Sequence, residues 1–228
     1  MLRKGKTWGC RALYSVAMSD LRLNTHEARA LGVLIEKELT TPDQYPLSLN
    51  SLLLGCNQKS SRDPVTDFTM AEIVVTVQGL VAKHLAGRSS GGRVERYRHN
   101  ANSRLGLSAP ESAILAVLLL RGAQQPGELR TRISRLAPGE SQEDVLRHLE
   151  SLAGKELVRN IGQRPGSRAE RWAQRLTPLE EQASSATITP STASPTPIAP
   201  APEPLAARVE SLEERVLKLE TLLADLGG

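Results

Sequence analysis

The sequence predicts a mainly α-helical protein with small β-hairpins, an α+β fold class in which one unit occurs twice and a short helix follows. Three observations predict it: a repeated pattern in the middle of the chain, a helix-start signal before each apolar stripe, and a terminal heptad of valine and leucine. The chain has 228 residues, 39% of them hydrophobic, and this length allows one or two domains. Its apolar runs are shorter than the roughly 18 to 20 residues that cross a bilayer, which excludes a membrane-spanning protein.

A repeated pattern defines the two copies. Segments 80–85 and 152–157 share Leu-x-x-Lys-x-Leu, and each precedes a glycine-containing turn. After the turn, segments 93–97 and 168–172 share Arg-x-Glu-Arg-aromatic. Successive side chains of a strand point to opposite faces, so the aromatic residue is expected to face the helices while the neighbouring arginines face outward. Each copy therefore ends in a predicted β-hairpin.

The first copy is predicted as a domain over 20–104. Asn24 is the expected N-cap of its first helix, Glu27 completes a capping box, and Pro42 follows the helix. Thr69 opens the third helix with a box of the same kind. The expected helices are about 25–39, 48–56 and 70–85, with a polar loop over 57–68.

The second copy is predicted as a domain over 105–178. Ser108 and Ser141 are the expected caps of its first and third helices, and Pro126 starts the second. The expected helices are about 109–121, 126–134 and 142–154. Three helices followed by a hairpin with a glycine-rich tip form the winged-helix arrangement. The sequence therefore predicts tandem winged-helix domains.

The two ends differ from the middle in composition. Residues 1–17 are basic and contain no acid, so we expect a disordered extension. A transit peptide has such a composition, but translation from Met18 is the interpretation that we favour. Residues 179–204 are rich in proline, serine and threonine and show no apolar periodicity, which predicts a disordered linker.

The last segment, 205–228, has a heptad pattern typical of a short coiled coil. Valine at the a positions with leucine at d favours a parallel two-stranded coil, so we expect a homodimer. The alternative is a lone amphipathic helix that packs on its own chain, because three heptads are marginal in isolation. The expected dimerisation residues are Leu205, Val209, Leu212, Val216, Leu219, Leu223 and Leu226.

Sequence signals for catalysis are weak. The four histidines lie far apart, and Cys10 and Cys56 form no metal-ligand pattern. The sequence contains no GxxxxGK loop for nucleotides. We therefore expect no enzyme activity, no metal and no cofactor. The low cysteine content suits a reducing, cytoplasmic compartment.

Two basic segments, 83–104 and 155–175, indicate a polyanionic partner, unless they are only solvated loops. We expect a transcriptional regulator that binds double-stranded DNA mainly through phosphates, with modest base readout. The expected contacts are Lys59, Arg62, Thr76, Gln78, Lys83, Arg88, Arg93, Arg96, Arg98, Arg164, Arg168, Arg171 and Arg175. For the polar run 57–63, local loop chemistry in which Asp63 holds Arg62 is an equal alternative.

A protein-interaction scaffold that binds no nucleic acid is the rival function. The third helix of the second copy contains Glu143, Asp144 and Glu150, and phosphates repel such a helix. The third helix of the first copy offers few side chains that read base edges. The salt dependence of DNA affinity separates the two functions, because phosphate contacts release counterions.

Three segments resemble the bacterial YceH family: 33–38 (VLIEKE), 40–50 (TTPDQYPLSLN) and 56–65 (CNQKSSRDPV). With both repeats, the resemblance covers about residues 20–177. It implies a tandem winged-helix fold and no particular activity, because the function of that family is essentially unassigned. The extension 1–17 departs from the usual start of the family, which favours initiation at Met18.

Overall fold

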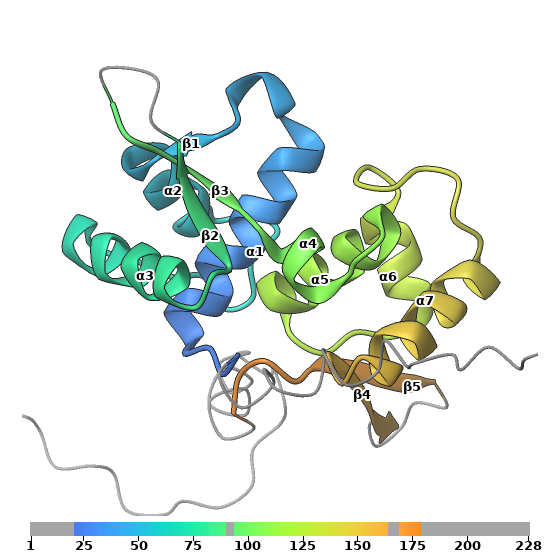
Figure 1. The fold of residues 1–228 in the computed structure, drawn as a ribbon. Coiled ribbons are helices and arrows are strands. Elements are labelled where there is room, and N and C mark those ends of the chain that lie inside the picture. The colour runs from blue at the N-terminus through green and yellow to red at the C-terminus, as the bar shows by residue number, and fades with distance from the viewer. Residues whose placement is uncertain (1–20, 90–93, 164–168, 179–228) are drawn as a thin grey trace, which may run out of the picture. The chain divides into compact units, whose positions relative to one another are not determined.

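The computed structural model describes residues 21–89, 94–163 and 169–178 (Figure 1). All of them belong to one compact unit of the α+β class, which combines helices with two small antiparallel sheets. The fold class predicted from the sequence is confirmed at this level. The predicted extension 1–17, the linker 179–204 and the coiled-coil helix with its dimerisation residues lie outside the described residues.

The first half of the unit contains three main helices and a three-stranded sheet. Its elements are α1 (Thr25–Thr40), the 3-10 turn η1 (Pro42–Gln44), β1 (Leu47–Ser48), α2 (Leu49–Cys56), α3 (Met70–Ala82), β2 (Ala86–Ser89) and β3 (Arg96–His99). The strand order is β1–β3–β2, and Tyr97 on the central strand pairs with Leu47 on one side and Arg88 on the other. The short helix α4 (Ala101–Leu105) leads into the second half.

The second half repeats this plan. Its elements are α5 (Ala109–Arg121), α6 (Pro126–Ile133), α7 (Gln142–Gly154), β4 (Val158–Gln163) and β5 (Glu170–Gln174). Strands β4 and β5 form an antiparallel pair. Gln124 makes an isolated antiparallel bridge to Trp172, at the place where β1 pairs with the hairpin in the first half. Each half therefore runs from three helices into a hairpin flanked by a short extended segment.

The helices begin where their capping signals predict. Glu27 N donates to Asn24 Oδ1 at 2.8 Å, and Asn24 N donates to Glu27 Oε2 at 2.9 Å. The same reciprocal box opens α3, α5 and α7 at Thr69, Ser108 and Ser141. Each box satisfies backbone N–H groups that lack an intrahelical partner. These predicted helix starts are confirmed.

The predicted end of the third helix is wrong. Helix α3 ends at Ala82 because His84 adopts φ 59° and turns the chain into β2. This conformation lets Leu85 N donate back to Leu80 O at 2.9 Å, which closes the helix end. Glu156 adopts the same φ of 59° after α7. The sequence patterns also miss β1 and α4, whose 2 and 5 residues are too few to show a periodicity.

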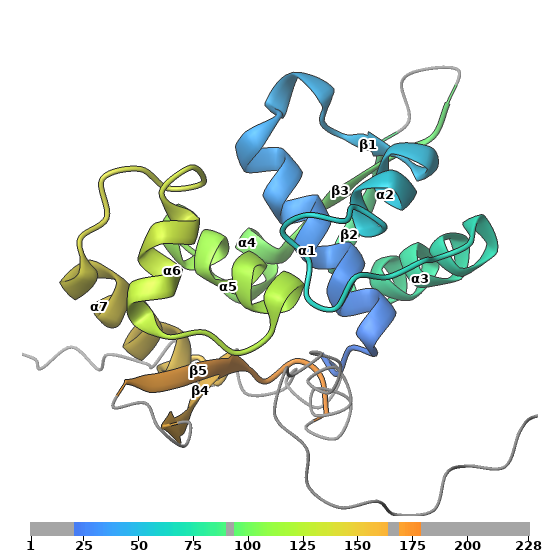
Figure 2. The same ribbon diagram turned by 180° about the vertical axis from the view of Figure 1, so that it is seen from behind.

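Helix α1 is the central helix of the unit. All residues from Glu27 to Ile35 are buried, because α1 packs against α3 and also against α5 of the second half (Figures 1 and 2). Gly32 lies at the α1–α5 contact, where an added Cβ would lie 2.9 Å from Leu120 Cγ. One apolar core therefore runs through both predicted domains, 20–104 and 105–178, which pack as two halves of one unit.

Candidate functional site

The lysine of the repeated Leu-x-x-Lys-x-Leu pattern ties the third helix of each half to the first. Lys83 Nζ donates to Arg22 O at 2.7 Å and forms an ion pair with the buried carboxylate of Glu27. Lys155 Nζ pairs in the same way with buried Glu111, at 2.7 Å. A DNA phosphate would have to displace a buried carboxylate to reach Lys83. The charge of Lys83, an expected DNA contact, is thus already paired within the protein.

Glu111 is the acceptor at the centre of the second link. Its carboxylate accepts hydrogen bonds from Lys155 Nζ at 2.7 and 2.8 Å, from Ser151 Oγ at 2.6 Å and from Ser108 N at 2.7 Å. Burial raises the pKa of Glu111, but the hydrogen bonds from Lys155, Ser151 and Ser108 outweigh burial and lower the pKa to about 2. Glu111 is thus an anion at neutral pH, and its role is structural.

The arginine that precedes the aromatic residue of each hairpin is also bonded internally. Arg96 Nη1 donates to Pro46 O at 2.9 Å, and Arg171 Nη2 donates to Ala123 O at 2.8 Å. Both carbonyl groups directly precede the short segment that pairs with the last strand of the hairpin. Tyr97 is buried, as predicted. The repeated arginines therefore fix the hairpins, although the side chain of Arg96 also stays exposed.

Two expected DNA contacts are buried, which corrects their assignment. The Arg62 side chain is fully buried, with Nη1 2.7 Å from Glu36 Oε2 and Nε donating to Gly55 O at 3.0 Å. Its acidic partner is Glu36, whereas Asp63, expected to hold it, is exposed. Thr76 is also buried, in the face of α3 that packs on the body. Neither side chain reaches the surface that a phosphate or a base edge would contact.

The remaining expected contacts are scattered. Those with exposed side chains, besides Arg96, are Lys59, Gln78, Arg88, Arg98 and Arg175. Arg88 Nε lies 3.6 Å from Glu95 Oε1, and both side chains are about half exposed, so the pair is weak. Arg93, Arg164 and Arg168 lie outside the described residues. Arg88, Arg96 and Arg98 all lie on the β2–β3 hairpin, but Arg88 pairs with Tyr97, so it lies on the opposite face of the hairpin from Arg96 and Arg98.

The exposed face of α3 is apolar rather than basic. Ala71, Val75, Gln78 and Ala82 follow one another at helical spacing, and all four are exposed. Val75 is 69% exposed and Met70 is 40% exposed, although both residue types are usually buried. Helix α3 contains no lysine or arginine. This face lacks the long cationic side chains that commonly read base edges, and Gln78 is its only side-chain amide.

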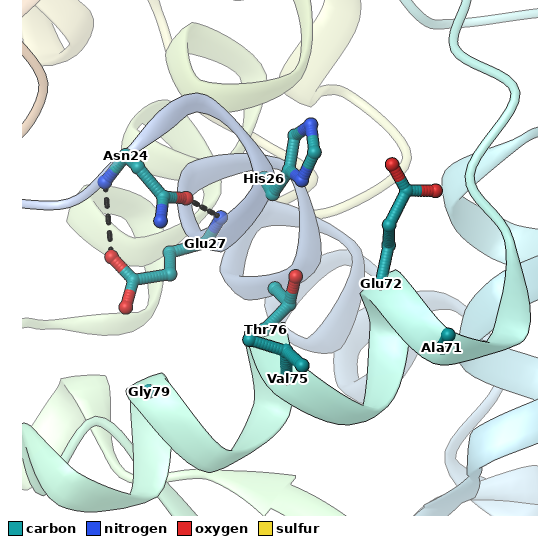
Figure 3. A pocket seen from close by; sticks show the side chains of 8 residues that line it. All are labelled: Asn24, His26, Glu27, Ala71, Glu72, Val75, Thr76 and Gly79. Atoms are coloured by element: carbon teal, nitrogen blue, oxygen red, sulfur yellow. Dashed lines mark hydrogen bonds between the residues drawn. The ribbon is translucent and has the colours of Figure 1, made fainter.

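A pocket of about 380 Å³ borders this face. Figure 3 shows its lining: Asn24, His26 and Glu27 from α1 and its cap, and Ala71, Glu72, Val75, Thr76 and Gly79 from α3. The His26 ring packs against Phe68, with 4.5 Å between ring centroids. An added Cβ at Gly79 would lie 2.3 Å from Glu27 Oε1, so glycine leaves room for this carboxylate. Sequence patterns do not predict the pocket, because it forms only where two helices pack.

The equivalent helix of the second half has a different surface. Helices α3 and α7 align without a gap, so that buried Ile73 matches buried Val145. In the same alignment Val75 matches Arg147, which pairs with Asp144 on its own helix. The apolar face is therefore a feature of α3 and not a consequence of the repeated fold.

Groups that could suggest catalysis have structural partners. His99 Nε2 lies 2.6 Å from Glu38 Oε2, and His99 Nδ1 accepts from Ala101 N at 3.2 Å, so both ring nitrogens are engaged. Burial raises the pKa of the Cys56 thiol to about 12, which keeps it protonated and unreactive. Within the described residues, no cluster of His, Cys, Asp and Glu could hold a metal ion, and no helix is long and apolar enough to cross a bilayer.

Comparison with known proteins places the chain among bacterial relatives. The family described as "Protein of unknown function, DUF480" matches residues 23–182. The chain belongs to this family. A UPF0502 protein of Shewanella halifaxensis is 43% identical over 180 residues, covering 75% of this chain and 84% of the relative. A UPF0502 protein of Geotalea daltonii is 49% identical over 158 residues, covering 68% and 72%. The DUF480 match thus identifies the relatives of the chain. The function of the chain is inferred from the surface that its structure presents.

Proposed function

We propose that the two halves are tandem winged-helix modules and that the chain is a cytoplasmic protein-interaction module, with α3 as its binding element. The order α1-β1-α2-α3-β2-β3 supports the winged-helix assignment, and the bridge between Gln124 and Trp172 extends the plan to the second half. In winged-helix and related DNA-binding proteins the exposed helix enters the major groove. In this chain the exposed helix has the surface of a protein interface.

The observation that carries the proposal is the exposure of apolar side chains around α3. Val75 is 69% exposed, and Leu54 on the neighbouring helix α2 is 65% exposed. Charged residues are depleted at the centres of protein interfaces. The exposed face of α3, formed by Ala71, Val75, Gln78 and Ala82, contains no charged residue. Full burial of a valine contributes about 1.5 kcal/mol, which corresponds to about a ten-fold gain in affinity. A partner that covers α3 would recover this energy.

Photo-crosslinking in cells tests the proposal. A photoreactive phenylalanine derivative replaces Val75 in one variant and Arg147, its match on α7, in the other. We expect crosslinks to a partner from position 75 and few from position 147. A Gln78→Glu substitution in the first variant should abolish the crosslinked product, because it places a charge in the face of α3 that the partner covers. Equal crosslinking from both positions would refute the proposal.

DNA binding is the second candidate function, and the arginines of the β2–β3 hairpin favour it. Arg88, Arg96 and Arg98 would contact phosphates, with base readout limited to Gln78 because α3 offers no cation. Three phosphate contacts predict a log–log salt slope of about −2.7. The Arg88→Ser/Arg98→Ser double variant should lose about 1.8 of this slope, measured by fluorescence anisotropy on duplex DNA. Arg130→Ser, an exposed arginine of α6, is the control. An unchanged slope in the double variant would remove the hairpin from the DNA surface.

A further inference from the structure

The pocket and the exposed face of α3 form one continuous surface, which we call the groove. Ala71 and Val75 belong to both, and Gly79 extends the pocket along the helix. In Figure 3 the His26 ring stands above the pocket on the α1 side, and Glu72 stands on the α3 side. The small side chains of Ala71 and Ala82 are exposed on either side of Val75, which allows another helix to approach closely. The 13 residues of α3 span about 20 Å, enough for nearly four turns of such a helix.

The rim of this groove is acidic at one end. Glu72 is exposed in the first turn of α3, and its Oε2 accepts hydrogen bonds from Thr69 N and Oγ1, both at 2.7 Å. The backbone and side-chain hydrogen bonds from Thr69 lower the pKa of Glu72, so the rim carries a full negative charge at neutral pH. Exposed Asp67 precedes the same helix. At the other end the charge of Lys83 is compensated by Glu27.

We propose that the groove binds an amphipathic helix of another protein, whose apolar side chains cover Val75 and whose lysine or arginine residues flank that stripe and meet Glu72. This proposal rests on the proposed function, since it names the partner of the same surface. Charge complementarity favours a different protein over the same face of a second copy of this chain. The exposed face of α3 in a second copy has no lysine or arginine that could meet Glu72.

Two fluorescent helical peptides of 18 residues test the proposal on the full chain. Both have leucine at helical spacing, and one has lysine along the flanks while the other has glutamate. We expect the lysine peptide to bind about five-fold more tightly, because one exposed ion pair contributes up to about 1 kcal/mol. Val75→Ser should weaken binding of the lysine peptide about ten-fold, because it removes the apolar contact without adding a charge.

Glu72→Gln is the decisive variant. Glutamine still completes the capping box with Thr69, so the helix start is kept while the charge is lost. We expect equal affinities for the two peptides in this variant, and an unchanged preference in Glu150→Gln, the exposed match of Gln78 on α7. If both peptides bind wild type equally, the basic partner is refuted while the proposed function stands. If neither binds and Val75→Glu abolishes a concentration-dependent dimer, the occupant is a second copy. If neither binds and no dimer forms, the helical partner is refuted, and the crosslinking from position 75 alone decides the proposed function.

Discussion

The link between Lys155 and Glu111 leads to a quantitative prediction for stability. The pKa of Glu111 falls from its ordinary value of 4.5 to about 2 in the folded protein. This difference corresponds to about 3 kcal/mol of folding free energy at pH 7. Because the folded pKa is the lower one, the contribution is complete above about pH 4.5 and is lost as the pH falls through about 2.

Lys155→Met removes the two hydrogen bonds to Glu111 at 2.7 and 2.8 Å and the one to Gly106 O at 2.7 Å, and it leaves the carboxylate of Glu111 with Ser108 and Ser151. Hydrogen bonds to charged groups contribute about 1.5 to 3 kcal/mol, so we expect a loss of about 2 kcal/mol at pH 7. Wild type should lose stability between pH 5 and pH 2.5, because Glu111 becomes protonated on unfolding in this range. In Lys155→Met this loss should be smaller by a similar amount. Urea unfolding across this pH range measures both quantities.

Arg147→Met is the matched control, because Arg147 pairs with Asp144 on the surface of the same helix. Its side chain is 70% exposed, so we expect a change within about 0.5 kcal/mol. If Lys155→Met costs no more than Arg147→Met, the buried ion pair contributes nothing measurable. If the variant keeps the wild-type dependence on pH, Lys155 is not what holds the pKa of Glu111 down.

Two further predictions concern the core. Gly32→Ala should destabilise the protein by about 1 to 3 kcal/mol in thermal unfolding, because its Cβ would lie 2.9 Å from Leu120 Cγ. Gly127→Ala, whose Cβ meets nothing within 4 Å in helix α6, should be neutral or stabilising by up to about 1 kcal/mol, and the reverse order would contradict the α1–α5 contact. In a Cys10→Ser background, Cys56 should resist a thiol reagent until urea unfolds the chain, because the pKa of its thiol is about 12. Rapid labelling of the folded protein would show that the thiol is accessible.

Helix starts could be predicted because their signals are local. Ser108 and Glu111 are three residues apart, and their reciprocal hydrogen bonds form wherever the helix starts. The end of α3 escaped prediction because His84 adopts a left-handed conformation that few residue types mark in a sequence. The hairpins could be predicted because the arginine and aromatic residues recur in both copies.

Whether each basic side chain is exposed or paired within the protein could not be predicted, because its partner lies far away in the sequence. Lys83 pairs with Glu27, and Arg62 pairs with Glu36, each across more than twenty residues of sequence. In the composition these side chains count as positive charge, whereas in the fold they are paired with acidic residues of α1. Lys83 and Lys155, one from each basic segment, are both paired with buried glutamates, so the two segments overstate the cationic surface of the protein.

Comparison of the two copies separates residues that hold the fold from residues that are open to function. Lys83 and Lys155 recur because each ties its third helix to a buried glutamate. The residue four positions before each lysine serves the same glutamate. Gly79 leaves room for the carboxylate of Glu27, and the matching Ser151 donates to the carboxylate of Glu111. Among the described residues, the recurring pairs Lys83/Lys155 and Arg96/Arg171 are therefore explained by folding, and repetition is a poor guide to a DNA surface.

The functional surface should instead lie where the copies diverge at equivalent exposed positions. Val75 and Arg147 occupy matching sites on α3 and α7, and both are about 70% exposed. The fold tolerates a charge at this position, as Arg147 shows, so folding does not require an apolar residue there. An exposed valine in a helix lowers solubility and is a poor helix former. The apolar face of α3 is thus better explained by a partner that covers it than by the stability of the chain.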